Sequence, residues 1–188
     1  MTVNTLVPGE FSGPWTIEDL QELPDQGYRY EIIDGSLLVT PPPAVPHIRV
    51  TTRLRNLLHA QTSPGFVVVE NGGITLWRDD TTYRIPDLTV LRSDALLRDA
   101  LTFEPADAPL VIEVLSPRTA GDDLVMKRYG YGRAGIPQYW IVDSRHRGLT
   151  VLRHDGAEGY LEETVVRPGT EWHTEMPFPI ALDPANFV

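Results

Sequence analysis

Two acidic side chains lie where the surrounding sequence makes a carboxylate costly. Glu113 interrupts the apolar run Leu110-Val-Ile-Glu-Val-Leu, and a charge buried there needs an ionic partner or a bound cation. Asp87 follows Pro86, whose ring restrains the backbone and gives Asp87 a defined orientation as it enters a strand. The plainer alternatives are an outward-facing or arginine-paired Glu113, and an Asp87 that serves only in a turn.

Lys127 is the only lysine in a chain that contains fifteen arginines. An ammonium group can be neutralised by burial and can carry a proton, whereas a guanidinium group does neither readily. Lys127 follows the Glu113 segment on a stretch with helical spacing. It is therefore a candidate catalytic residue, and a surface ion pair with Asp123 at i,i+4 is the plainer alternative.

The three residues together indicate metal-dependent phosphate chemistry. Carboxylates on adjacent strands can hold one Mg²⁺, with Mn²⁺ as the alternative ion, while water and a substrate phosphate complete the shell. Such an ion activates water and neutralises charge on phosphorus. A nearby amine can position or deprotonate that water. We therefore expect Asp87 and Glu113 to be the metal ligands and Lys127 to complete the catalytic set.

The elements that must position these residues alternate between strands and helices. We expect a helix over residues 16–23, a hairpin over 28–40 that turns at Asp34-Gly35, and a helix over 47–62. Further expected segments are strands 66–69, 74–77, 85–91 and 110–115, helix 122–133, strand 138–143 and a hairpin built from 149–153 and 160–166. The strand over 85–91 is expected to be interrupted at its start by Pro86-Asp87. The tail from Pro168 is expected to pack over the sheet.

The fold class that follows is α/β. Strand, helix and strand between residues 110 and 143 predict a parallel pair with a right-handed crossover. We expect a central mixed β-sheet flanked by helices, with an added N-terminal β-hairpin and a C-terminal hairpin. With 188 residues the chain is long enough for one domain, expected over residues 15–188 after a flexible arm over residues 1–14.

Charge and composition restrict the partners. The net charge of −10 opposes tight binding of a polyanion at long range. No acidic residue lies between Asp34 and Glu70, however, and Arg49 and Arg53 fall inside that window. These two arginines are candidates for nucleic-acid contacts, and a plain solvated helix face is the alternative.

The compartment is predicted from what the sequence lacks. There is no cysteine, which rules out disulfides and thiolate zinc sites. There is also no apolar run of the length that crosses a bilayer. We expect no membrane partner and a cytoplasmic location.

Several motifs together resemble a known nuclease family. Ile85-Pro-Asp87, then Ile112-Glu113-Val-Leu-Ser, then Lys127 resemble the PD-(D/E)xK superfamily, in the branch known as Uma2 or DUF820. Tyr30-Glu31-Ile-Ile-Asp-Gly, His47 at the start of a helix, and Gly135-Ile-Pro-Gln-Tyr-Trp-Ile-Val-Asp143 are similar to that family in the same order. The resemblance spans residues 15 to 187.

The resemblance implies a restriction-endonuclease-like fold and Mg²⁺-dependent hydrolysis of DNA. It implies that Asp87 and Glu113 bind the metal and that Lys127 is the catalytic lysine. In the usual superfamily motif the lysine lies two residues after the acid, where this chain has Leu115. Lys127 must therefore reach the site from the helix.

Three further residues are possible supporting members of the site. Glu31 could add a carboxylate or be an exposed strand acid. His47 precedes apolar helix positions and could be a structural histidine. Tyr131 lies four residues after Lys127 on the same helical face and either lines the cleft or packs in the core.

The predicted function is that of an endonuclease acting on DNA. A homodimer is expected, because one site cuts one strand. Two alternatives stay open: a catalytically inactive nuclease-fold module that binds a protein, and a metal-dependent hydrolase of a smaller phosphate ester.

Overall fold

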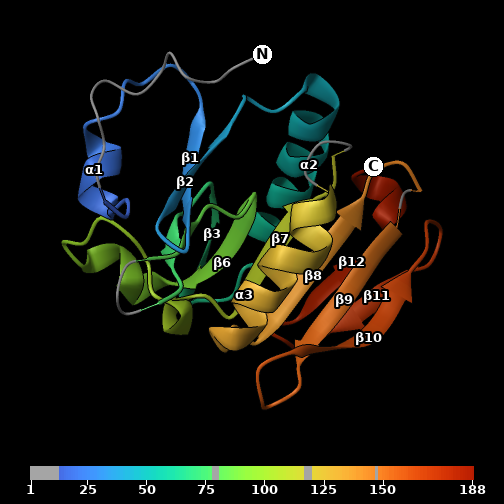
Figure 1. Cartoon of the computed structure of the whole chain (residues 1–188). Coiled ribbons are helices and arrows are strands. Elements are labelled where there is room, and N and C mark those ends of the chain that lie inside the picture. Colours follow the sequence, from blue (N-terminus) through green and yellow to red (C-terminus); the bar gives the residue numbers. More distant parts are fainter. Residues whose placement is uncertain (1–12, 78–80, 117–119, 147) are drawn as a thin grey trace.

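The structure, a computed structural model, describes residues 13–77, 81–116, 120–146 and 148–188. It has a central six-stranded sheet in the order β10-β9-β8-β7-β6-β3, a four-stranded sheet in the order β2-β1-β5-β4, and a two-stranded ribbon. Helices lie against the central sheet (Figure 1). The predicted α/β fold with a mixed central sheet is therefore confirmed. Residues 1–12 of the expected N-terminal arm lie outside the described residues.

The central sheet is antiparallel except at its middle. β7 and β8 pair in parallel, with Ile112 opposite Trp140, as the strand–helix–strand pattern predicts. The hairpin expected near the C-terminus extends this sheet, since β9 pairs with β8. The strands are β3 (Phe66–Glu70), β6 (Leu88–Arg92), β7 (Leu110–Val114), β8 (Gln138–Asp143), β9 (Gly148–His154) and β10 (Tyr160–Val166).

The smaller sheet is built on the N-terminal hairpin of β1 (Arg29–Ile33) and β2 (Ser36–Thr40). Asp34 and Gly35 have φ values of 46° and 76°, as a two-residue hairpin turn of this type requires. β5 (Tyr83–Arg84) and β4 (Ile74–Thr75) complete the sheet.

The strand expected over residues 85–91, with an interruption at Pro86-Asp87, begins only after that interruption, at Leu88. The chain leaves β5 after Arg84 and begins β6 at Leu88, in the other sheet. Pro86 has no backbone N–H to give to a ladder, and the segment from Ile85 to Asp87 crosses between the two sheets. This crossing places Asp87 at the junction of the sheets.

Helices cover both faces of the central sheet. α1 (Ile17–Gln21), which begins at a capping box on Thr16, lies beside the smaller sheet instead (Figure 1). α2 (Val45–Gln61) begins two residues before the expected position, because Pro46 suits a first helical turn. The helix on the opposite face is a π-helical turn over Asp122–Lys127 that continues into α3 (Arg128–Arg133).

The C-terminal tail packs against the α2 face of the sheet, as expected. It forms a ribbon of β11 (Trp172–Thr174) and β12 (Ile180–Leu182). Its buried side chains, including Phe178 and Phe187, join the core that contains Leu54 of α2. Within the part of the chain that the structure describes, no helix has the length and apolar character that crossing a membrane demands.

Replacement of Leu54 by alanine should destabilise the fold by about 2–5 kcal/mol, because Leu54 is fully buried between α2 and the sheet and truncation leaves a cavity. Urea titration of the variant would measure the loss. Arg53→Ala on the exposed side of α2 is the control and should lie near wild type. Equal stability of the two variants would contradict this packing.

Candidate active site

The register of the central sheet places Asp87 next to Glu113. Leu88 of β6 pairs with Ile112 of β7, so one step further along these antiparallel strands Asp87 lies opposite Glu113. Alternation along β7 sends Leu110, Ile112 and Val114 into the α2-side core, while Glu113 faces the helix that carries Lys127. The two acids thus come together on adjacent strands, as the sequence predicts.

Glu113 is bonded to two residues of the helix above it. Lys127 Nζ donates to Glu113 Oε1 at 2.8 Å, and the Tyr131 hydroxyl donates to the same oxygen at 2.9 Å. The partner of this buried acid is therefore a lysine, not an arginine. Lys127 Nζ also lies 3.3 Å from Asp123 Oδ1. That i,i+4 pair exists, but it is buried rather than on the surface.

Asp87 is held from three directions. Arg29 Nη1 donates to Oδ1 at 3.0 Å, the backbone N–H of Val114 donates to Oδ2 at 2.9 Å, and His47 Nε2 lies 2.9 Å from Oδ2. Burial opposes the ionisation of Asp87, but His47, Arg29 and Lys127 outweigh it and hold its pKa well below the usual range. Since an ionised carboxylate only accepts hydrogen bonds, His47 Nε2 carries the proton.

Glu31 enters the cluster from the N-terminal hairpin. Its Oε1 accepts a hydrogen bond of 2.8 Å from the backbone N–H of Ile85 and lies 4.0 Å from Lys127 Nζ. Arg84 lies 3.8 Å from Oε2 and donates through both terminal nitrogens, at 3.1 Å each, to the Asp122 carboxylate. Glu31 is thus buried in the site rather than exposed on a strand.

The cluster contains more acids than bases. With His47 neutral, five carboxylates against three permanent cations leave a formal charge of −2; the residues are Glu31, Asp87, Glu113, Asp122 and Asp123 against Arg29, Arg84 and Lys127. Most of these groups are nearly fully buried; Glu113 is 1% and Lys127 3% exposed. Buried excess charge is relieved by a proton or by a bound cation.

The pKa values of the central pair reflect this excess. Burial raises the pKa of Glu113 well above its usual value; Asp87 and Asp123 add to the rise, and Lys127 opposes it. Burial alone would lower the pKa of Lys127, but the carboxylates of Glu113, Glu31 and Asp123 raise it above its usual value. Lys127 therefore keeps its proton near neutral pH, whereas Glu113 takes one up more readily than an ordinary glutamate.

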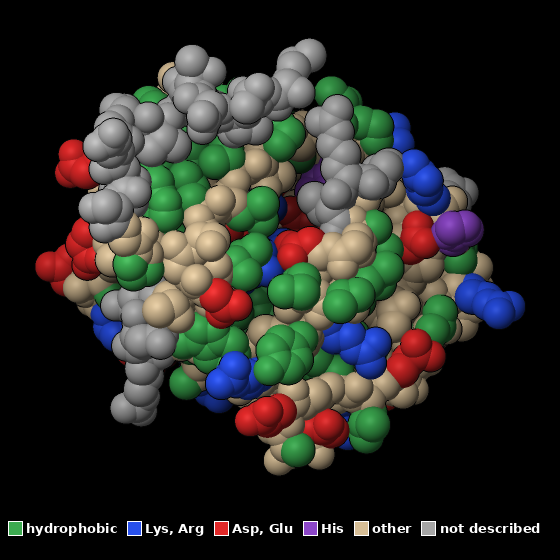
Figure 2. All heavy atoms as spheres, in the orientation of Figure 1, with side chains coloured by type: hydrophobic (Ala, Val, Ile, Leu, Met, Phe, Trp, Pro, Cys, Tyr) green, Lys and Arg blue, Asp and Glu red, His purple; other side chains and the backbone are tan. Residues whose placement is uncertain are grey.

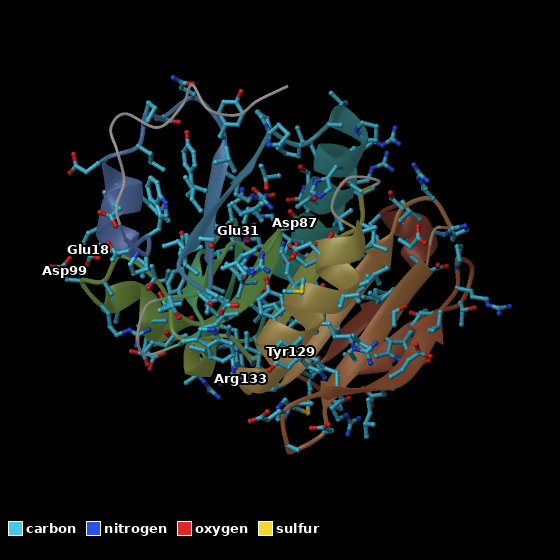
Figure 3. The ribbon with its side chains drawn as sticks, viewed as in Figure 1. Glu18, Glu31, Asp87, Asp99, Tyr129 and Arg133 are labelled. Carbon is cyan, nitrogen blue, oxygen red and sulfur yellow. The ribbon has the colours of Figure 1, made fainter. Side chains whose placement is uncertain are left out.

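A cleft of about 560 Å³ opens onto the cluster. Acidic and basic side chains lie together at the bottom of the hollow in Figure 2. One wall carries the charged groups, and the other is formed by β2 and the prolines that follow it, Pro41 to Pro43. Glu31 and Asp87 point into the space between the hairpin, α2 and α3 (Figure 3).

The donor set suits a hard divalent cation held through two carboxylates. Within the described ranges, no group of three or more His, Asp or Glu side chains has the arrangement of a metal cage. Mg²⁺ does not need one, because it commonly binds through one or two carboxylates and keeps several waters. Asp87 and Glu113 offer oxygen ligands on adjacent strands, and the local charge of −2 matches a divalent ion. The residues present therefore fit Mg²⁺ or Mn²⁺.

The candidate residues that the sequence singles out divide into two groups. Six of them converge here: Asp87, Glu113, Lys127, Glu31, His47 and Tyr131. Arg49 and Arg53 do not; they are exposed on α2 and do not line the cleft.

Sequence reasoning missed the two arginines of the cluster and the site roles of Asp122 and Asp123. Arg29 and Glu31 occupy alternate positions of one strand, so they share a face, which was the available signal. Arg84 gives no comparable signal, because the chain contains many arginines.

Comparisons with known proteins bear on the family and on the fold. The model of the Uma2 family, described as "Putative restriction endonuclease", matches residues 17–185. A search of solved structures finds similarity to the crystal structure of a putative nuclease belonging to DUF820 from Anabaena variabilis ATCC 29413, with a TM-score of 0.74, 18% sequence identity, and coverage of 93% of this chain and 97% of that one. A search of curated proteins finds no match.

Glu113→Gln should remove a pH dependence of stability. A carboxyl whose pKa is raised on folding stabilises the protein fully below its unfolded value, 4.5, and loses that contribution as pH rises through the folded pKa. The free energy of unfolding of wild type should therefore fall relative to Glu113→Gln as pH rises above 4.5. Urea titrations without metal would measure it. Parallel curves for the two proteins would contradict the shift.

Proposed function

Since the chain belongs to the Uma2 family, we propose that it is an Mg²⁺-dependent endonuclease that hydrolyses phosphodiester bonds of DNA. One observation carries the proposal: Lys127 Nζ lies 2.8 Å from Glu113, inside a buried cluster with excess negative charge, and Asp87 lies on the adjacent strand. A structural ion pair between Lys127 and Glu113 would not require the other carboxylates of the cluster. A divalent cation that binds a phosphate substrate does require carboxylate ligands.

Asp87 and Glu113 are the residues that would hold the ion. When bound, Mg²⁺ supplies charge neutralisation at phosphorus and a water of lowered pKa. Arg29 and His47 keep the Asp87 carboxylate ionised and oriented. Tyr131 fixes Glu113 Oε1 through its hydroxyl, so both carboxylates are positioned before substrate arrives.

Lys127 acts in this proposal as a hydrogen-bond donor and electrostatic partner rather than as a base. Its pKa is raised by the carboxylates around it, so the ammonium form persists at neutral pH. An ammonium group in a site shielded from water stabilises negative charge that develops on a phosphoryl oxygen and orients the attacking water.

Binding of DNA and dimerisation belong to the same proposal. Arg49 and Arg53, exposed on α2, are suited to phosphate contacts, which position a strand without reading its sequence. A homodimer would supply a second site for the second strand. The ratio of nicked to linear plasmid product distinguishes single-strand from paired cleavage.

A smaller phosphate ester is the second candidate substrate. The cleft volume of about 560 Å³ lies in the range of small-ligand sites. The net charge of −10 is also less unfavourable for a small anion than for a polyanion. Small phosphodiesters therefore belong in the same assay as nucleic acids.

Purified protein with Mg²⁺ or Mn²⁺ should cleave plasmid DNA, and Asp87→Asn, Glu113→Gln and Lys127→Met should each slow cleavage by about a hundredfold or more. Gel assays of product over time give the rates. Asp99→Asn and Glu18→Gln change exposed acids distant from the site (Figure 3) and should cleave like wild type.

The outcomes of this assay separate the alternatives. Hydrolysis of small diesters alone would favour the smaller substrate. Wild-type protein that is inert on nucleic acids and small esters in both metals would overturn the enzyme proposal and favour the protein-binding module.

Binding of Mg²⁺ should stabilise the folded protein, since the unfolded chain has no site. At a metal concentration of about a hundred times the dissociation constant the gain is about 2.7 kcal/mol, seen as a higher melting temperature. Asp87→Asn and Glu113→Gln should lose most of the gain, and Glu18→Gln should keep it. An equal gain in all variants would place the ion elsewhere.

A further inference from the structure

A second cavity adjoins the acidic cleft. Its volume is about 380 Å³, and it lies between α1, the start of β1 and β5. Arg29, Pro42 and Pro43 line both hollows, so the two share a wall. We call this second cavity the aromatic pocket, after the rings of Tyr28, Tyr30 and Tyr83 that line it.

The lining of the aromatic pocket combines flat rings with amide groups. Tyr28 and Tyr83 contribute rings, and Gln21 and Asn71 contribute side-chain amides. Tyr83 packs tightly over Gly73: a Cβ atom there would lie 2.0 Å from the Tyr83 hydroxyl oxygen. Burial raises the pKa of Tyr83 to about 12, so this ring stays neutral. Such a lining suits an uncharged planar group with hydrogen-bonding edges.

One guanidinium group separates this pocket from the proposed metal ligands. Arg29 Nη1 donates to Asp87 Oδ1 at 3.0 Å, and Nη2 donates to Asn71 Oδ1 at 2.6 Å. Asn71 has a φ of 55°, a left-handed conformation that few residues other than glycine adopt. Its own N–H donates to the Asp87 carbonyl oxygen at 3.3 Å. Asn71 is therefore linked to Asp87 directly through its backbone and, by way of Arg29, through its side chain.

We propose that the aromatic pocket binds the base of a nucleotide whose phosphate lies at Asp87 and Glu113. This inference rests on the proposed nuclease function and names its substrate class. A base can enter the pocket only when it is neither paired nor stacked, so in a duplex the base must first be unpaired and unstacked. A strand with an unpaired nucleotide at the cut, such as single-stranded DNA, a gap or a frayed end, is therefore the preferred substrate, and plasmid duplex is cut more slowly.

The charges in the two cavities agree with a base in the aromatic pocket and a phosphate in the acidic cleft. Anionic phosphate lies at the metal side, where the ion and Lys127 offset its charge. Arg29, the cation that both cavities share, is already bonded to Asp87 and Asn71. The rest of the aromatic pocket is lined by uncharged side chains. Stacking on tyrosine accepts any base, so cleavage should show little sequence preference.

Cleavage of single-stranded oligonucleotides by Tyr28 variants tests the pocket. Tyr28→Leu removes the stacking ring and should slow cleavage at limiting substrate about tenfold. Tyr28→Phe keeps the ring and should cleave like wild type. Tyr129→Leu is the matched control, because Tyr129 is exposed on α3 and far from both cavities (Figure 3). Urea titration of each variant checks that the fold is retained.

An abasic nucleotide, placed in turn on each side of the mapped cleavage position, removes the base instead of the ring. At one of the two positions it should slow wild type about as much as Tyr28→Leu does, and the two changes together should not add, because they remove one contact. Additive effects, or a Tyr28→Leu rate equal to that of Tyr129→Leu, would overturn the base pocket. So would a duplex cut as fast as a single strand. All three results leave nuclease activity standing, whereas inert wild type removes both proposals.

Discussion

The ion pair between Glu113 and Lys127 is the interaction on which the arrangement of the molecule depends. Glu113 lies on β7, a central strand that pairs with β6 on one side and β8 on the other, and only 1% of it is exposed. Removing one partner of such a pair leaves a buried charge and is strongly destabilising. The helix above β7 must therefore keep Lys127 over Glu113, and a π-helical turn, a feature often found at functional sites, holds it there.

The two faces of the central sheet have different roles: one packs the apolar core, and the other carries the charged cluster. On the α2 face, apolar side chains from β7 and β8 pack with the C-terminal ribbon in a continuous core. On the other face, the small sheet brings Glu31 and Arg84 against residues of the π-helical turn. The charged cluster thus needs both sheets, and the segment from Ile85 to Asp87 that crosses between them fixes their relation. The free energy gained by packing the apolar face offsets the repulsion among the carboxylates of the cluster.

The site residues that the sequence predicted are those that are unusual in their local sequence. Glu113 interrupts an apolar strand, Asp87 follows a proline, and Lys127 is the only lysine, so each attracts attention alone. Arg29 is not unusual in its local sequence. Its partner Asp87 is 58 residues away, so only the fold reveals the pairing. The same applies to the break between β5 and β6, because short apolar segments do not specify which sheet they join. The layered α/β fold was predictable, since strand and helix periods are local properties.

The excess charge of the cluster also bears on how an acidic protein could act on an anion. A phosphate that approached the cleft without a cation would meet a formal charge of −2 and a cost in electrostatic free energy. In the proposed function a divalent ion would cancel that charge, and substrate phosphate would supply some of its oxygen ligands. Under the proposed function, binding of ion and substrate are therefore coupled, and each strengthens the other by the same factor. The net charge of −10 thus argues against tight binding of nucleic acid without metal. It does not argue against metal-dependent cleavage, because cleavage depends on the local charge at the reacting phosphate.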